Sequence, residues 1–180
     1  MRQAPHSASR GFTLVEIMVV VLIIGIMAAG VTLMTSVAHG DRELEQERDR
    51  ILALTDYLRD QAALQNREFG MRCFQGGYEF LVYEPRTGLW ERYIGDDVLR
   101  QRKLPQGIEM TVTIEGRPIV LPKEDQKPDE IAPQVMLYSS GELNLFQLTL
   151  RREQLGEGIR LAPAATSDRI EASKLAAGAA

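Results

Sequence analysis

The sequence predicts an α+β fold in which one long N-terminal helix packs on a C-terminal antiparallel β-sheet domain. Three observations predict it. Residues 12–37 are almost entirely apolar, and residues 41–66 are rich in Glu, Arg, Leu, Gln and Ala, which are strong helix formers. After residue 66, apolar and polar residues alternate in short runs. A long helix followed by successive short strands is typical of the α+β class.

The apolar stretch has the length of a membrane span. Residues 17–31 contain no charged or polar side chain, and Glu16 is the one ionisable residue in residues 12–37. A helix over residues 12–37 would be about 39 Å long at about 1.5 Å per residue, whereas the hydrocarbon core of a bilayer is about 30 Å thick. We therefore expect a transmembrane helix.

Three interpretations of this stretch are open. A secretory signal peptide has a basic start and an apolar core of about 7–15 residues, but this core is longer and holds Glu16. A plain membrane anchor would carry Glu16 only as an energetic cost. In the third interpretation Glu16 has a partner, because an ionisable residue in a membrane segment is by default a functional-site hypothesis. Gly25 and residues 28–30 either permit close helix contact or face lipid.

The residues around Glu16 favour the third interpretation. Arg2 and Arg10 form a short basic leader, which is followed by the heptapeptide GFTLVEI from Gly11 and then by the apolar run. This pattern resembles the class III signal of type IV pilins and type II secretion pseudopilins. The resemblance implies that a prepilin peptidase cuts between Gly11 and Phe12, that the Phe12 amine is N-methylated, and that the retained helix later packs into a filament.

The resemblance also implies a partner for Glu16, namely the Phe12 amine of a neighbouring subunit. At about 4 Å and an effective dielectric constant near 20, that attraction is on the order of 4 kcal/mol before desolvation. A carboxylate without a partner in the apolar core would be costly. Glu16 is therefore hypothesised to specify the register of filament assembly; the alternative is a tolerated charge near the membrane interface.

The helix is expected to continue beyond the apolar stretch. Leu44, Ile51 and Leu58 recur at seven-residue spacing, which is an amphipathic stripe. No proline occurs in residues 12–66, so one helix is predicted there, with a possible bend at Gly40. The stripe is expected to pack on the sheet.

Alternation and turn residues locate the strands. Gln75-Gly76-Gly77 is a hairpin signal between two apolar runs. The tail is rich in Ala and Ser, and it is expected to be flexible with at most a weak helix. The predicted strands are residues 69–74, 78–83, 89–94, 109–115, 118–121, 146–151 and 159–162.

Two further segments resemble one branch of the pilin-like family, the minor pseudopilins H. They are LPQGI at residues 104–108 and PQVMLYSSG at residues 133–141, where Leu137 and Ser139 depart from the usual aromatic residue and proline. The branch implies a single-pass inner-membrane protein with its C-terminal domain in the periplasm, at the tip of a pseudopilus that exports folded proteins across the outer membrane. The implied partners are the prepilin peptidase/N-methyltransferase, other minor pseudopilins, the major pseudopilin and the inner-membrane assembly platform.

The sequence offers no catalytic constellation. It has two histidines, His6 and His39, and neither a phosphate-binding loop nor paired metal-binding cysteines. Cys73 is the single cysteine, which excludes an intramolecular disulfide and favours a buried thiol. The charged loop at residues 122–133 lacks a calcium-ligand pattern and is expected to be a solvated loop, with partner or ion binding as the alternative.

We therefore expect a non-enzyme without cofactor or metal. The net charge of −4 argues against nucleic-acid binding. The alternatives are a minor type IV pilin, including one for DNA uptake, and a bitopic membrane enzyme or sensor. The expected organisation is a leader at 1–11, a transmembrane or filament-core helix at 12–37, its amphipathic continuation at 38–66, a periplasmic β-rich domain at 67–163 and a flexible tail at 164–180.

Overall fold

A computed structural model describes residues 14–125, 127, 131–152, 156, 158–165 and 169–176, with the side chains of residues 28–41 outside the description. The chain divides into two compact units, Met1–His39 and Gly40–Ala180. The first unit is helical where it is described. The second contains the continuation of the helix and all the strands.

One helix, α1, runs over Leu14–Gln65. It ends where Asn66 adopts a left-handed conformation with φ of 49°. There the Arg67 amide donates to the Ala62 carbonyl at 3.2 Å and the Asn66 amide to the Ala63 carbonyl at 3.4 Å. This pattern is a Schellman motif, in which two otherwise orphaned carbonyls gain donors. Within the described residues, the predicted uninterrupted helix is confirmed.

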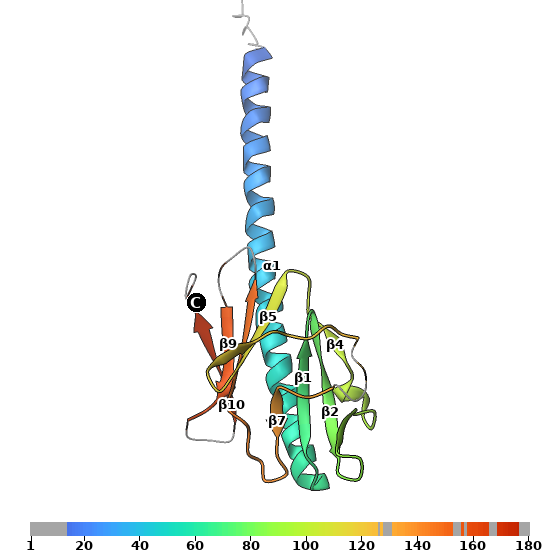
Figure 1. The fold of residues 1–180 in the computed structure, drawn as a ribbon. Coiled ribbons are helices and arrows are strands. Elements are labelled where there is room, and N and C mark those ends of the chain that lie inside the picture. Colours follow the sequence, from blue (N-terminus) through green and yellow to red (C-terminus); the bar gives the residue numbers. More distant parts are fainter. Residues whose placement is uncertain are drawn as a thin grey trace, which may run out of the picture. The chain divides into compact units, whose positions relative to one another are not determined.

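The strands form two antiparallel sheets, which confirms the predicted α+β class (Figure 1). The first sheet has the order β3-β2-β1-β7, with β4 also paired to β2, and the second has the order β10-β9-β8-β5-β6. A short 3-10 helix, η1, spans Asp97–Leu99. The strands are β1 Phe69–Phe74, β2 Gly77–Glu84, β3 Leu89–Arg92, β4 Arg102–Lys103, β5 Ile108–Ile114, β6 Arg117–Ile119, β7 Val135–Leu137, β8 Phe146–Arg152, β9 Gly158–Pro163 and β10 Ile170–Leu175.

The predicted hairpin joins β1 to β2. Phe74 pairs with Gly77 across a two-residue loop, in which Gly76 has φ of +86°. A Cβ on Gly77 would lie 2.3 Å from the Arg102 carbonyl oxygen and 2.7 Å from the Phe74 ring. Both glycines are therefore required, one by its backbone conformation and the other by the close approach of β4.

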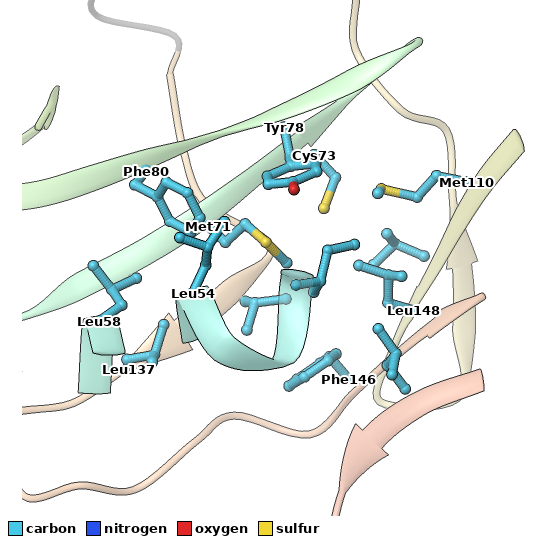
Figure 2. Packing of buried hydrophobic residues seen from close by; sticks show 14 of the residues in the cluster. Leu54, Leu58, Met71, Cys73, Tyr78, Phe80, Met110, Leu137, Phe146 and Leu148 are labelled. Carbon is cyan, nitrogen blue, oxygen red and sulfur yellow. The ribbon is translucent and has the colours of Figure 1, made fainter. Parts of the chain in front are cut away.

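The core lies between the second half of α1 and the two sheets. The predicted stripe is buried, with Leu44, Ile51 and Leu58 at 5%, 1% and 0% exposure. Figure 2 shows Leu54 and Leu58 of α1 among side chains from both sheets, including Met71 and Phe80 from the first and Met110 and Leu148 from the second. One helix face thus serves as the common core of both sheets.

The prediction of a flexible tail at residues 164–180 was wrong for residues 170–175. They form β10, which pairs with β9 from Ile170 to Leu175. Four of its six side chains are exposed and the two end residues are half-buried, so it has no buried face to produce apolar alternation. Backbone pairing to an existing strand therefore defines this strand, and residue pattern alone did not reveal it. The short strand β4 was missed as well.

Replacing Leu58 with alanine should lower the free energy of unfolding by about 2–5 kcal/mol, because a fully buried leucine leaves a cavity between α1 and the sheets. Leu64→Ala is the matched control on the same helix. Leu64 is 79% exposed, so its loss should cost less than about 0.5 kcal/mol. Urea denaturation of the purified chain in detergent measures both, and equal effects would contradict the packing described here.

Candidate functional site

The predicted assembly motif falls at the start of α1. Glu16 lies in the first helical turn and its side chain is exposed. A carboxylate at this position interacts favourably with the helix macrodipole. Gly11 and Phe12, the predicted cleavage and methylation residues, lie outside the described residues, so the structure places Glu16 alone of the three. Their roles remain predictions.

An apolar surface follows Glu16. Every described side chain from residue 14 to residue 27 is exposed, and the large apolar ones are 43–77% exposed. Apart from Gly25 itself, its two chain neighbours and the backbone of the surrounding helical turns, no atom of the described residues lies within 4 Å of a Cβ built on Gly25. A helix that exposes apolar side chains all round requires a non-aqueous environment or other helices around it. Among the residues that the structure describes, no helix meets the length and hydropathy of a membrane span.

The buried carboxylate of Glu47 connects α1 to the first sheet through a hydrogen bond. Glu47 is 1% exposed, and its side chain accepts hydrogen bonds from the Tyr78 hydroxyl of β2 at 2.7 Å and from Arg50 at 2.5 Å. Burial, and then the hydrogen bond to Glu47, raises the pKa of Tyr78, so its hydroxyl stays protonated as a donor. A hydrogen-bonded carboxylate inside the core fixes the position of this part of α1 on β2.

Two ion pairs connect the same segment of α1 to the second sheet. Glu43 pairs with Arg152 of β8 at 2.5 Å, and Glu45 pairs with Lys174 of β10 at 3.0 Å. The hydrogen bond from Lys174 lowers the pKa of Glu45. Partly exposed pairs of this kind contribute little stability, but they place β8 and β10 beside the helix.

Arg72 centres a second buried network, on β1. Its guanidinium is fully buried, pairs with Glu79 of β2, and donates to the carbonyls of Lys123 at 2.8 Å and Glu124 at 3.3 Å. Glu79 also pairs with Arg92 at 2.8 Å. The network holds the first residues of the predicted 122–133 loop against the first sheet, so this described part is tethered. Residues 126 and 128–130 lie outside the described residues, and the alternative of partner or ion binding there stays a prediction.

Sequence reasoning missed both buried networks, although one left a signal. Arg72 and Glu79 are equidistant from the Gln75-Gly76 loop, and the register pairs them directly. Opposite charges at such positions form a cross-strand pair. The Glu47–Tyr78 contact had no such signal, because it joins residues far apart in sequence on different elements.

The interpretation of Cys73 as a buried thiol is confirmed. Its side chain is fully buried, and burial raises its pKa to about 12. A thiol with so high a pKa is a poor nucleophile. Within the described residues, no group of His, Cys, Asp and Glu side chains is arranged to hold a metal.

Three features together define a prepilin-like protein. The helix has an exposed apolar start, it carries a carboxylate in its first turn, and antiparallel sheets pack on its second half. Residues 6–32 match the prokaryotic N-terminal methylation motif. The chain is 38% identical over 147 residues to type II secretion system protein H of Pseudomonas aeruginosa, covering 79% of this chain and 83% of that protein. It is 32% identical over 148 residues to protein H of Aeromonas hydrophila, covering 79% and 81%.

Solved structures share the fold. The minor pseudopilin EpsH of Vibrio cholerae aligns with a TM-score of 0.57 at 21% identity, over 76% of this chain and 99% of that one. GspH of E. coli aligns with a TM-score of 0.52 at 17% identity, over 75% and 89%. The fold is thus pilin-like. The chain belongs to the type II secretion system protein H family of minor pseudopilins, and this membership favours type II secretion over the alternative of a minor type IV pilin.

Replacing Tyr78 with phenylalanine should lower the free energy of unfolding by about 1–3 kcal/mol, because buried Glu47 loses a donor while the ring is kept. Tyr138→Phe is the control: Tyr138 is 37% exposed, and its hydroxyl donates to the sulfur of Met136 at 3.5 Å. Chemical denaturation of the two variants compares them. Equal stability of Tyr78→Phe and the parent chain would contradict a role for this hydrogen bond in fixing α1.

Proposed function

We propose that this minor pseudopilin is a structural subunit at the tip of a periplasmic pseudopilus and is needed for the export of folded proteins across the outer membrane. The observation that carries the proposal is that the methylation motif at residues 6–32 covers the exposed apolar start of α1, which begins at Leu14 and has Glu16 in its first turn. A buried core helix would not expose this surface, and a polymerising helix requires it.

We further propose the location and topology of the chain. Residues 12–37 would anchor it in the inner membrane with a single pass, and the unit from Gly40 onward would lie in the periplasm. Before assembly, lipid would surround the exposed apolar side chains of residues 14–27. In the pseudopilus, the helices of neighbouring subunits would take the place of lipid, so that the same apolar surface serves both states.

Glu16 would guide the replacement of lipid by the helices of neighbouring subunits. After cleavage between Gly11 and Phe12, the N-methylated Phe12 amine of one subunit would lie beside Glu16 of the next. Correct axial register gives the carboxylate a cationic partner, whereas a slipped register leaves it desolvated without one. Glu16 would therefore specify register more than it adds net stability.

The partners follow from this role. The prepilin peptidase/N-methyltransferase would process the chain, the inner-membrane assembly platform would drive its extraction, and other minor pseudopilins and the major pseudopilin would surround it in the pseudopilus. We propose a structural role without catalysis, cofactor or nucleic-acid binding. The high pKa of buried Cys73 supports this role, since the one thiol of the chain is unsuited to nucleophilic chemistry.

Mass spectrometry of the mature N-terminus tests the processing. From cells that contain the prepilin peptidase, the chain should begin at N-methylated Phe12. From a strain without the peptidase, it should retain residues 1–11. A mature chain that begins beyond Gly30 would instead indicate removal of the apolar helix by ordinary secretion, and the proposed function would fail.

Substitution of Glu16 by alanine or glutamine should leave membrane insertion and cleavage intact while it reduces secretion of folded substrates severely, because the register-specifying charge is lost. Met18→Ala is a control in the same exposed segment, where Met18 is 65% exposed. It removes apolar area without touching the charge, and secretion should continue. Secretion and mature mass are measured in the same cells; normal secretion by Glu16→Ala would defeat the register hypothesis.

A further inference from the structure

The second sheet carries a polar pocket of about 360 Å³ on the face turned away from the core. Met110 of β5, Leu148 of β8 and Ile159 of β9 belong to the core, so their sequence neighbours point to the opposite, outward face. Leu175 is the one apolar side chain among the described residues that line the pocket. The lining also includes Glu109, Thr111, Thr149, Arg151 and Arg160.

Strand register places three hydrogen-bond donors of this pocket in one row. Thr111 of β5 pairs with Thr149 of β8, and Thr149 pairs with Arg160 of β9. Neighbouring strands of a sheet lie about 4.8 Å apart. A small ligand above Thr149 is therefore within reach of a hydroxyl on one side and of a guanidinium on the other.

A glycine keeps the adjacent row open. Gly158 of β9 pairs with Arg151 of β8 on one side and with Leu175 of β10 on the other. A Cβ built on Gly158 would lie 3.5 Å from Nε of Arg151 and 3.6 Å from a methyl carbon of Leu175. Both of these residues line the pocket, so any larger side chain at residue 158 would fill the space between them.

Two polar groups in the row have hydrogen-bonding capacity left for a ligand. Thr149 is only 9% exposed, and its hydroxyl makes no hydrogen bond within the described part of the chain. Nε of Arg160 is buried and has no hydrogen-bond partner among the same residues. Buried polar groups are almost always hydrogen-bonded, so two such groups in neighbouring positions of one pocket point to a bound partner.

We propose that this pocket binds the phosphate group of a small molecule or of a lipid. The guanidinium of Arg160 and the hydroxyls of Thr111 and Thr149 would donate hydrogen bonds to the phosphate oxygens, and a tetrahedral phosphate presents oxygens to donors from several strands.

The charge and shape of the lining favour this class of ligand. Two arginines against one glutamate give the pocket a net positive charge. Glu109 pairs in the ladder with Arg151, which places the glutamate two strands away from Arg160. Among the described lining residues none is aromatic, so an uncharged sugar ring would find no face to stack on.

Nuclear magnetic resonance of the isotope-labelled full chain in nonionic detergent tests the site, with inorganic phosphate as the probe. The backbone amide signals of Thr149 and Arg160 should shift saturably with phosphate, and chloride at the same ionic strength should not reproduce the shifts. Arg160→Gln should raise the dissociation constant by about tenfold or more, because a charged donor is lost. Thr149→Val keeps the shape of the side chain and should raise it by about threefold or more.

Arg117→Gln is the matched control. Arg117 belongs to β6 of the same sheet, is exposed and does not line the pocket. The substitution removes the same charge from the chain, so a phosphate affinity equal to that of the parent chain is expected. Circular dichroism checks that the three variants fold alike, and Thr149→Val still tests the site if Arg160→Gln does not fold.

Nanodiscs distinguish the two sources of phosphate. If the ligand is a lipid headgroup, nanodiscs of anionic phosphatidylglycerol should shift the Thr149 and Arg160 signals of the parent chain but not the Thr149 signal of Arg160→Gln. If the ligand is soluble, these signals should shift only when glycerol phosphate is added. Either result supports a phosphate site.

Three outcomes would overturn the inference. They are the absence of saturable shifts with inorganic phosphate, equal shifts with chloride, and an unchanged dissociation constant in both Arg160→Gln and Thr149→Val. The phosphate site goes beyond the proposed function and is tested separately from it. A chain that is processed at Phe12 and supports secretion but binds no phosphate excludes only the site.

Discussion

Burial of one face of α1 against both sheets is the interaction on which the rest of the structure depends. The two sheets share no strand, and their apolar side chains meet in one cluster with Ile51, Leu54 and Leu58 of the helix. Complete burial of aliphatic side chains of this size is worth about 1.5–3 kcal/mol each. The helix therefore organises the domain, and its position determines where each sheet lies.

Polar contacts fix the position of α1 along and around its axis, which the apolar packing alone does not. Hydrophobic contact is not directional, so a smooth stripe would permit sliding or rotation of α1. Glu47 meets Tyr78 of the first sheet, whereas Glu43 and Glu45 meet Arg152 and Lys174 of the second. The three glutamates lie in one five-residue segment of α1, shortly after the boundary between the two compact units at residue 40.

The elements that the sequence predicted well are those with a local or periodic signal. The uninterrupted helix, its Leu44–Ile51–Leu58 stripe and the β1–β2 hairpin each follow from residue spacing or turn chemistry. Strand β10 could not be predicted in this way, because its side chains are mostly exposed and its partner is another strand. The Glu47–Tyr78 contact could not either, because it depends on tertiary packing. For Glu16 the motif predicted the role, and the structure adds its exposure in the first helical turn.

The burial of Cys73 has a consequence for redox chemistry. In an oxidising compartment such as the proposed periplasm, a lone accessible thiol tends to pair with the same thiol of another molecule. Here β1 holds the sulfur inside the core, and its pKa of about 12 keeps it as the unreactive thiol. The chain is thereby protected from covalent dimerisation by its own packing, without any need for a reductant.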